Sequence, residues 1–140
     1  MSGERVFVDT DVLVYAFDDA EPKKQKRAVH TLSERLAGSQ IVVSTQVLQE
    51  LYVALTRGTA PIATPEIAER AVRDASAFMV VQVDVPLVLE AIGEAQRRSI
   101  SFWAALIVRA ARSAGCDTLL SEDLGTGETI DGVSVQNPFA

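Results

Sequence analysis

The sequence is poor in the residues from which many catalytic and metal sites are built. It has one cysteine, Cys116, and one histidine, His30. These two residues cannot supply the three or four nitrogen and sulfur ligands of a typical zinc site, and a lone cysteine cannot form a disulfide within the chain. A Ser-His-Asp or Cys-His mechanism would have to use His30 alone. We interpret Cys116 as a small buried apolar residue and His30 as a partly exposed helix residue.

Long apolar segments are also absent. The longest uninterrupted apolar run is Phe102–Val108, whereas a helix that spans a bilayer needs about 20 such residues. No apolar stretch follows the first five residues, as it would in an export signal. Together with the lone cysteine, these features favour a cytoplasmic protein that is not inserted in a membrane.

Positive charge is scarce and local. The chain has 13 Lys and Arg against 19 Asp and Glu, which gives a net charge of −6. This balance excludes affinity for nucleic acid from overall charge, because phosphate binding needs clustered cations. All lysines lie in the run Lys23–Arg27. The simplest interpretation of that run is a solvated helix face, and the alternative is a local cluster that binds phosphate.

The remaining composition predicts one folded domain over residues 1–140, because a chain of this length buries roughly 68% of its unfolded surface. Short β-rich runs alternate with longer segments of helical period, as in a parallel sheet covered on both faces. We therefore expect an α/β fold, a three-layer α/β/α sandwich with a small, mostly parallel five-stranded sheet. The expected strands are Arg5–Val8, Gln40–Val43, Phe78–Val83, Thr118–Leu120 and Val133–Gln136. The expected helices are Glu21–Ala37, Thr45–Arg57, Pro65–Ala77, Pro86–Arg98 and Phe102–Ala114.

Apolar stripes at helical spacing indicate the core-facing sides of two helices. In Thr45–Arg57 the stripe contains Leu48, Leu51, Tyr52 and Leu55, and in Pro86–Arg98 it contains Val88, Leu89, Ile92 and Ala95. The helix Phe102–Ala114 is apolar almost all round up to its arginines. We expect it to be the central buried helix.

Acidic residues follow several of the expected strands. Asp9 and Asp11 follow the first strand, Glu50 lies in the helix after the second, and Glu122 and Asp123 follow the fourth. The carboxyl ends of parallel strands meet at one edge of a sheet, so these acids are expected to be neighbours. Clustered carboxylates repel one another unless a cation neutralises them, and oxygen ligands without His or Cys favour Mg²⁺ or Mn²⁺ over zinc. A purely structural alternative is that Asp9 caps a helix starting at Asp11 and that Asp123 forms a turn before Gly125.

Three segments resemble the PIN-domain ribonucleases, most closely the VapC-like toxins of type II toxin–antitoxin systems. These segments are VFVDTDVLVYAFD, STQVLQELYVAL and SFWAALIVRAARSAGCDTLLSEDLGTG. The resemblance implies a Mg²⁺- or Mn²⁺-dependent endoribonuclease that is dimeric and inhibited by a cognate antitoxin. By position it makes Asp9, Glu50 and Asp123 the catalytic and metal-binding acids, with Glu122 as a helper.

The sequence departs from that family pattern at two positions. Asp11 stands where an Asn is common, which adds a carboxylate. Ala104 follows Phe102-Trp103, where the family has its third Asp. Either a deliberate replacement of a catalytic acid or a natural degenerate member would produce this alanine. A catalytically silent PIN domain that binds antitoxin or RNA is therefore the alternative function.

A second alternative is a phosphatase of the haloacid dehalogenase type, because VFVDTDVLV contains an Asp-x-Asp after a strand. In that enzyme class Asp9 would be the nucleophile and Asp11 the acid/base. The chemistry also needs a lysine after the second block to hold the phosphoryl group. This sequence has no lysine beyond Lys26, so the ribonuclease interpretation is favoured.

Overall fold

A computed structural model describes residues 4–125 and 127–140. A six-stranded sheet runs through it in the order β3-β2-β1-β4-β6-β5. The strands are β1 Glu4–Val8, β2 Ser39–Ser44, β3 Met79–Val81, β4 Thr118–Leu120, β5 Thr129–Ile130 and β6 Val133–Gln136. The helices are α1 Thr10–Tyr15, α2 Pro22–Gly38, α3 Thr45–Thr56, α4 Pro65–Ala75, α5 Val85–Arg98 and α6 Phe102–Ser113.

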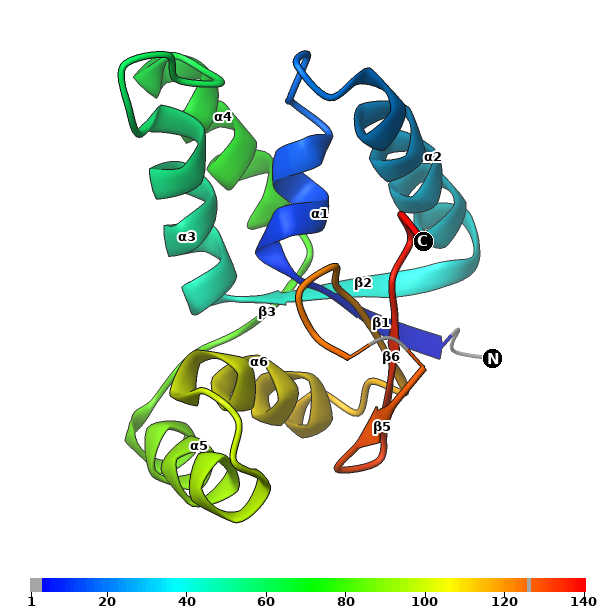
Figure 1. Cartoon of the computed structure of the whole chain (residues 1–140), viewed down its shortest axis with the longest axis vertical. Helices are drawn as coiled ribbons and strands as arrows, with labels where there is room; N and C mark the ends of the chain where they lie inside the picture. The colour runs from blue at the N-terminus through cyan, green and yellow to red at the C-terminus, as the bar shows by residue number, and fades with distance from the viewer. Residues whose placement is uncertain (1–3, 126) are drawn as a thin grey trace.

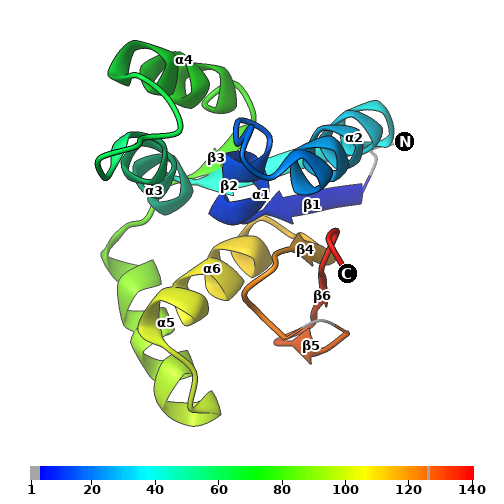
Figure 2. The same ribbon diagram turned by 45° about the horizontal axis from the view of Figure 1, so that its top comes forward.

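Helices cover both faces of this sheet. The helices α5 and α6 lie on one side, and α1, α2, α3 and α4 lie on the other (Figures 1 and 2). All strand pairs are parallel except β5 with β6. The predicted α/β fold with a mostly parallel central sheet is thereby confirmed. Within the described residues, no helix is both long enough and apolar enough to cross a membrane.

The central strand β1 determines where the residues that follow the first and fourth strands meet. It pairs with β2 on one side and with β4 on the other, and Val6, Phe7 and Val8 are fully buried. A parallel strand covered on both faces reads as a continuous apolar run, as this one does. Because Val8 is opposite Leu120 in the register, the residues that follow β1 and β4 emerge next to each other.

Local sequence explains where the helices begin. Ser44, Thr64, Asp84 and Ser101 each accept a hydrogen bond from the backbone N–H three residues later, at the starts of α3, α4, α5 and α6. Side-chain oxygens at this position satisfy donors that the first helical turn leaves free. Proline in the first turn of α2, α4 and α5 has no N–H that would need a partner.

The structure differs from the sequence-based expectation in two elements. The sheet has six strands and not five, because Thr129–Ile130 adds a two-residue antiparallel edge strand. The short helix α1 was expected only as a possible helix start at Asp11, and it begins at Thr10, directly after its N-cap Asp9. Both elements are too short to produce a readable hydrophobic period.

The expected core stripes were partly wrong. On α5 the buried residues are Leu87, Ala91 and Glu94, whereas Leu89 and Ile92 are 62% and 41% exposed. On α3, Leu51 and Leu55 are buried but Tyr52 is exposed. The α5 prediction failed because its buried face contains a charged residue, Glu94, which no hydrophobic pattern assigns to a core. The expectation for α6 was correct, since six of its residues are buried.

Candidate metal and active site

Acidic side chains gather at the carboxyl edge of β1 and β4. The backbone N–H of Asp9 donates to the carbonyl of Leu120 at 2.9 Å, which joins the ends of the two strands. Asp9 and Asp11 leave β1 on one side of this junction, and Glu122 and Asp123 leave β4 on the other. Glu50 approaches from α3, which packs against α1.

A cavity of about 260 Å³ brings the three expected site residues Asp9, Glu50 and Asp123 together. The other residues that line it come from α1, α3, α6 and the segment after β4. They are Thr10, Asp11, Gln46, Ser101, Trp103, Ala104, Ile107 and Leu124. Acids separated by more than a hundred residues in the sequence thus line the same cavity.

The carboxylate of Asp9 is held from two directions. Its Oδ1 accepts from the backbone N–H of Thr10 at 2.7 Å, and its Oδ2 accepts from the Ser121 hydroxyl at 2.9 Å. Burial, followed by the smaller effects of the nearby charges of Glu50 and Asp123, nevertheless raises the pKa of Asp9 from 3.8 to about 6. The structural role expected for Asp9, capping a helix, therefore coexists with membership of the acidic cluster.

Asp11 is the most perturbed acid of the cluster. Burial, followed by the charge of Asp9, raises its pKa from 3.8 to about 7. Its Oδ2 accepts from the backbone N–H of Glu122 at 3.0 Å. Its Oδ1 is buried without a hydrogen-bond partner. A buried carboxylate oxygen without a donor is costly, and a cation bound beside it would offset that cost.

Glu50 is oriented by two polar neighbours. Its Oε1 accepts from the Thr10 hydroxyl at 2.9 Å, and its Oε2 accepts from the Gln46 side-chain amide at 3.3 Å. The amide oxygen of Gln46 is itself buried without a partner. Asp11 and Gln46, which both line the cavity, therefore each have one buried oxygen without a hydrogen-bond partner among the described residues.

Glu122 occupies the rim and differs from the other acids. Lys24 Nζ lies 2.5 Å from its Oε2, and the Tyr15 hydroxyl donates to its Oε1 at 2.9 Å. The hydrogen bond from Lys24 lowers the pKa of Glu122, although burial opposes this shift. One carboxylate oxygen each from Asp11, Glu122 and Asp123 lie within 4.8 Å of one another. This carboxylate group thus contains Asp11 and Glu122, to which the sequence analysis assigned only secondary roles.

These residues fit a divalent cation that prefers oxygen ligands. The cavity supplies carboxylates and an amide oxygen, offers no histidine or cysteine, and leaves two buried acceptor atoms unpartnered. Burial is the first cause of the raised pKa values of Asp9 and Asp11, and neighbouring carboxylates add to it, so a bound cation would favour the charged forms of both acids. An ion with hard-ligand preference, such as Mg²⁺ or Mn²⁺, matches this donor set.

Ala104 lies where an additional acid would complete the cavity. It is in the first turn of α6, and its N–H donates to Ser101 Oγ at 3.0 Å. Its methyl group lines the same cavity as the three expected acids. The preceding Trp103 is 61% exposed. The wall contributed by α6 is therefore apolar at the position where the sequence pattern expects a carboxylate.

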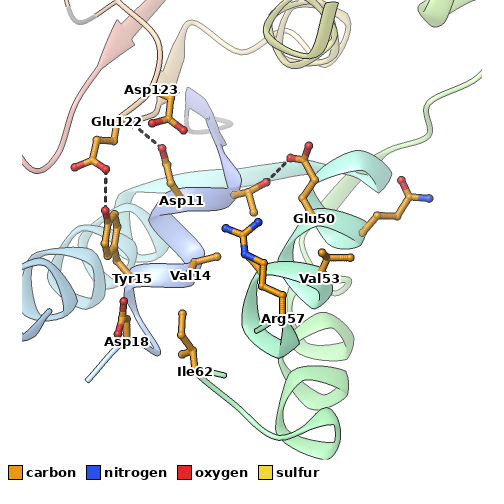
Figure 3. A pocket seen from close by; sticks show the side chains of 13 residues that line it. Asp11, Val14, Tyr15, Asp18, Glu50, Val53, Arg57, Ile62, Glu122 and Asp123 are labelled. Carbon is orange, nitrogen blue, oxygen red and sulfur yellow. Dashed lines mark hydrogen bonds between the residues drawn. The ribbon is translucent and has the colours of Figure 1, made fainter. Parts of the chain in front are cut away.

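A larger groove of about 600 Å³ continues from the acids between α1 and α3 (Figure 3). Asp11, Glu122 and Asp123 lie at one end, and Val14, Val53 and Ile62 lie farther along it. Arg57 at the end of α3 also lines the groove. The acidic site therefore opens into a groove with an apolar floor and one guanidinium.

Several residues of the site were missed by sequence reasoning. Gln46 carries no recognisable signal, because a single Gln in a helix has no preferred role. Tyr15 and Lys24 meet Glu122 only through the packing of α1 against α2. Ser121 and Thr10 lie beside acids in the sequence, and this adjacency is the signal that could have drawn attention to them.

The chain was compared with known proteins. It matches the PIN domain family over residues 6–128. A comparison with curated protein sequences finds no match. Among solved structures, VapBC2 from Rickettsia felis bound to a promoter DNA fragment is similar, with 16% identity, a TM-score of 0.68, and coverage of 95% of this chain and 98% of that one.

Two further solved structures have the same fold. A toxin–antitoxin complex from Klebsiella pneumoniae shares 18% identity, with a TM-score of 0.68 and coverage of 95% of this chain and 97% of that one. VapC20 from Mycobacterium tuberculosis, a sarcin-ricin loop cleaving toxin, shares 21% identity, with a TM-score of 0.61 and coverage of 81% and 86%. The family match gives no support to the phosphatase alternative. With an acidic cavity at the carboxyl edge of a mostly parallel sheet and a family match over most of its length, this chain belongs to the PIN domain family.

Proposed function

We propose that this protein is a metal-dependent endoribonuclease of the VapC toxin type, in which Ala104 lowers the activity of an otherwise complete site. The observation that carries the proposal is the cavity that Asp9, Glu50 and Asp123 share, together with its two unpartnered oxygens. The similar fold of VapC20, which cleaves the sarcin-ricin loop, supports RNA as the substrate class.

In this proposal the chain's own residues hold and orient the catalytic centre. Asp9, Glu50 and Asp123 would hold Mg²⁺ or Mn²⁺, with Asp11 and Gln46 facing the same space. When bound, such an ion lowers the pKa of a water and stabilises charge on phosphoryl oxygens. Thr10 fixes Glu50, Ser121 fixes Asp9, and Lys24 fixes Glu122 through the hydrogen bonds described above.

A catalytically silent PIN domain is the second candidate, and the position of Ala104 favours it. If the missing acid were indispensable, the cavity would still bind a cation or a basic side chain without cutting RNA. The two candidates predict different outcomes of one assay, because only the first retains measurable cleavage.

We further propose an antitoxin partner, a homodimer and a cytoplasmic location. The similar structures from Rickettsia felis and Klebsiella pneumoniae are toxin–antitoxin complexes. An antitoxin would approach the acidic cavity with Arg or Lys, since a cation offsets the clustered negative charge. The support for a cytoplasmic location is the lone cysteine, Cys116, which is free and buried.

The test is cleavage of single-stranded and hairpin RNA by the purified chain with Mg²⁺ or Mn²⁺, compared with the same reaction in EDTA. We expect metal-dependent cleavage that is lost in Asp9→Asn, Glu50→Gln and Asp123→Asn. Glu69→Gln, which removes an exposed acid on α4, is the matched control. Cleavage that persists in EDTA and in all three variants would contradict the proposal.

A further inference from the structure

Two groups of cations in this protein have different surroundings. On α5 and α6 the arginines are neutralised by acids. Arg97, Arg98 and Arg109 contact the buried Glu94, and Arg109 and Arg112 contact Asp131. This cluster stabilises the contact of α5, α6 and the β5–β6 turn, and it leaves little free positive charge for a partner.

The cations on α2 are different. Lys23, Lys26 and Arg27 are exposed and form no ion pair within the described part of the chain. With His30 they follow the spacing i, i+3, i+4, i+7, so they share one helix face. These four residues, here called the α2 basic face, line a surface hollow of about 320 Å³. His30 Nε2 lies 3.7 Å from Glu34 Oε2.

The α2 basic face is connected to the acidic site by Lys24. Its ammonium donates to Glu122 and, at 3.2 Å, to the Tyr15 hydroxyl. Tyr15 and Glu122 line the groove that leads to the acids (Figure 3). On its other side, Lys24 shares a hollow of about 180 Å³ with Lys23, Arg27 and Phe139. The surface therefore leads from the acidic groove, across Lys24, to the unpaired cations.

Aromatic rings accompany this path. Tyr15 and Phe139 pack edge to face with ring centroids 4.9 Å apart, and Lys24 Nζ lies 4.7 Å from the centre of the Tyr15 ring. Cations interleaved with aromatic rings are the typical surface for single-stranded nucleic acid. An acidic peptide could also pair with these cations. It would gain nothing, however, from a surface that leads on to a cavity of carboxylates.

We propose that the α2 basic face binds backbone phosphates of the RNA strand and leads it to the acidic cavity. The inference rests on the proposed function, in which RNA occupies that cavity. A chain with a net charge of −6 repels RNA at long range, so productive binding needs a local surface with free positive charge. Lys23, Lys26 and Arg27 supply this charge beside the site.

The experiment measures RNA binding without cleavage. Affinity for a labelled, unstructured RNA of about 12 nucleotides is measured by fluorescence anisotropy in EDTA at several salt concentrations. The variant Lys23→Gln/Lys26→Gln is compared with Arg70→Gln/Arg73→Gln. Both variants remove two cations at i, i+3 from an exposed helix face, so they change the net charge equally.

We expect the Lys23/Lys26 variant to bind about five- to tenfold more weakly at low salt, and its log–log salt slope to be smaller by about 1.4, or ~0.7 for each lost phosphate contact. The Arg70/Arg73 variant should bind within about twofold of the parent chain. Equal weakening in both variants, or no measurable binding by the parent chain at low salt, would overturn the inference. The inference would also be overturned if the Lys23/Lys26 variant lost binding to an acidic partner peptide while its affinity for RNA stayed unchanged.

These outcomes are separate from those of the proposed nuclease. If RNA binding depends on the α2 basic face but no metal-dependent cleavage is found, the inference about α2 is supported and the proposed nuclease activity is contradicted. Cleavage with unchanged RNA affinity in the Lys23/Lys26 variant would support the nuclease and overturn the role of α2.

Discussion

At the scale of single residues, Ala104 has the largest expected effect on activity. Ala104→Asp adds a carboxylate to the cavity that contains Asp9, Glu50 and Asp123. We expect RNA cleavage in Mg²⁺ or Mn²⁺ to rise by at least ~10²-fold, the scale of one positioned catalytic group. The fold should tolerate the change, because position 104 is in the first turn of α6, where the helix dipole favours an acid.

Ala104→Asn is the control for this substitution. It has nearly the same shape as the aspartate but carries no charge, so it should leave cleavage near the level of the parent chain. Initial rates on one RNA substrate, with and without EDTA, provide the measurement. Equal cleavage by the alanine, asparagine and aspartate forms, with EDTA making no difference to any of them, would show that the cavity is not the metal site.

The raised pKa of Asp11 predicts that the stability of the fold depends on pH. Its pKa is about 7 in the folded protein against an ordinary value of 3.8. Between these values the folded state binds more protons than the unfolded state, so the free energy of unfolding falls as pH rises through this window. Asp9, with a pKa of about 6, acts in the same direction. In metal-free buffer the protein should therefore lose stability between about pH 4 and pH 7.

The variant Asp11→Asn tests whether Asp11 causes this pH dependence of stability. The amide keeps an acceptor for the Glu122 N–H and replaces the unpartnered Oδ1 with an uncharged group. In EDTA at pH 7.5 it should raise the free energy of unfolding by roughly 1–2 kcal/mol, after allowance for partial solvent screening. Thermal melts from pH 4 to pH 8 should become flatter. A variant with the same pH slope as the parent would exclude Asp11 as the cause.

At the scale of elements, the buried Glu94 holds α5 to α6. It is 1% exposed and contacts three arginines from the two helices. Glu94→Gln replaces charge-assisted hydrogen bonds with weaker neutral ones, so it should destabilise the fold by about 1.5–3 kcal/mol. The arginines themselves are not stranded, because Arg97 and Arg98 are exposed and Arg109 keeps Glu90 and Asp131. Glu69→Gln removes an exposed partner of Arg73 on α4 and should cost less than about 1 kcal/mol. Urea unfolding of both variants gives the comparison, and equal midpoints would contradict a structural role for Glu94.

The same helix shows where sequence reasoning stops. The β-rich runs and the segments of helical period predicted most element boundaries within two residues, because these patterns are local in the sequence. The buried face of α5 was misassigned, since Glu94 is buried only through arginines supplied in part by α6. The residues of the acidic edge were predictable from their places after strands. The roles of Gln46 and Lys24 were not, because both depend on packing between helices.

At the scale of the whole molecule, charges of opposite sign are concentrated on different elements. Carboxylates concentrate at one edge of the sheet, the arginines of α5 and α6 are used within the fold, and the free lysines lie on α2 beside the acidic groove. The acidic cluster joins segments that are far apart in the sequence, namely the end of β1, the first half of α3 and the loop after β4. An ion bound there would link all three segments.

This linkage predicts that Mn²⁺ or Mg²⁺ stabilises the folded chain. An ion that binds only the native state adds about 2.7 kcal/mol at one hundred times its dissociation constant, which corresponds to several degrees in Tm. Glu50→Gln and Asp123→Asn should lose most of this shift. Glu34→Gln, which removes an exposed acid on α2, should keep it.

The metal-induced shift should also depend on pH, since protons compete with the ion for Asp9 and Asp11. Their pKa values of about 6 and about 7 place this competition near neutrality. The increase in Tm should be largest near pH 8 and should shrink progressively as the pH falls below about 6. Scanning calorimetry with and without Mn²⁺ across this range measures it. An equal shift at all pH values, or in the Asp123→Asn variant, would show that the ion binds elsewhere on the molecule.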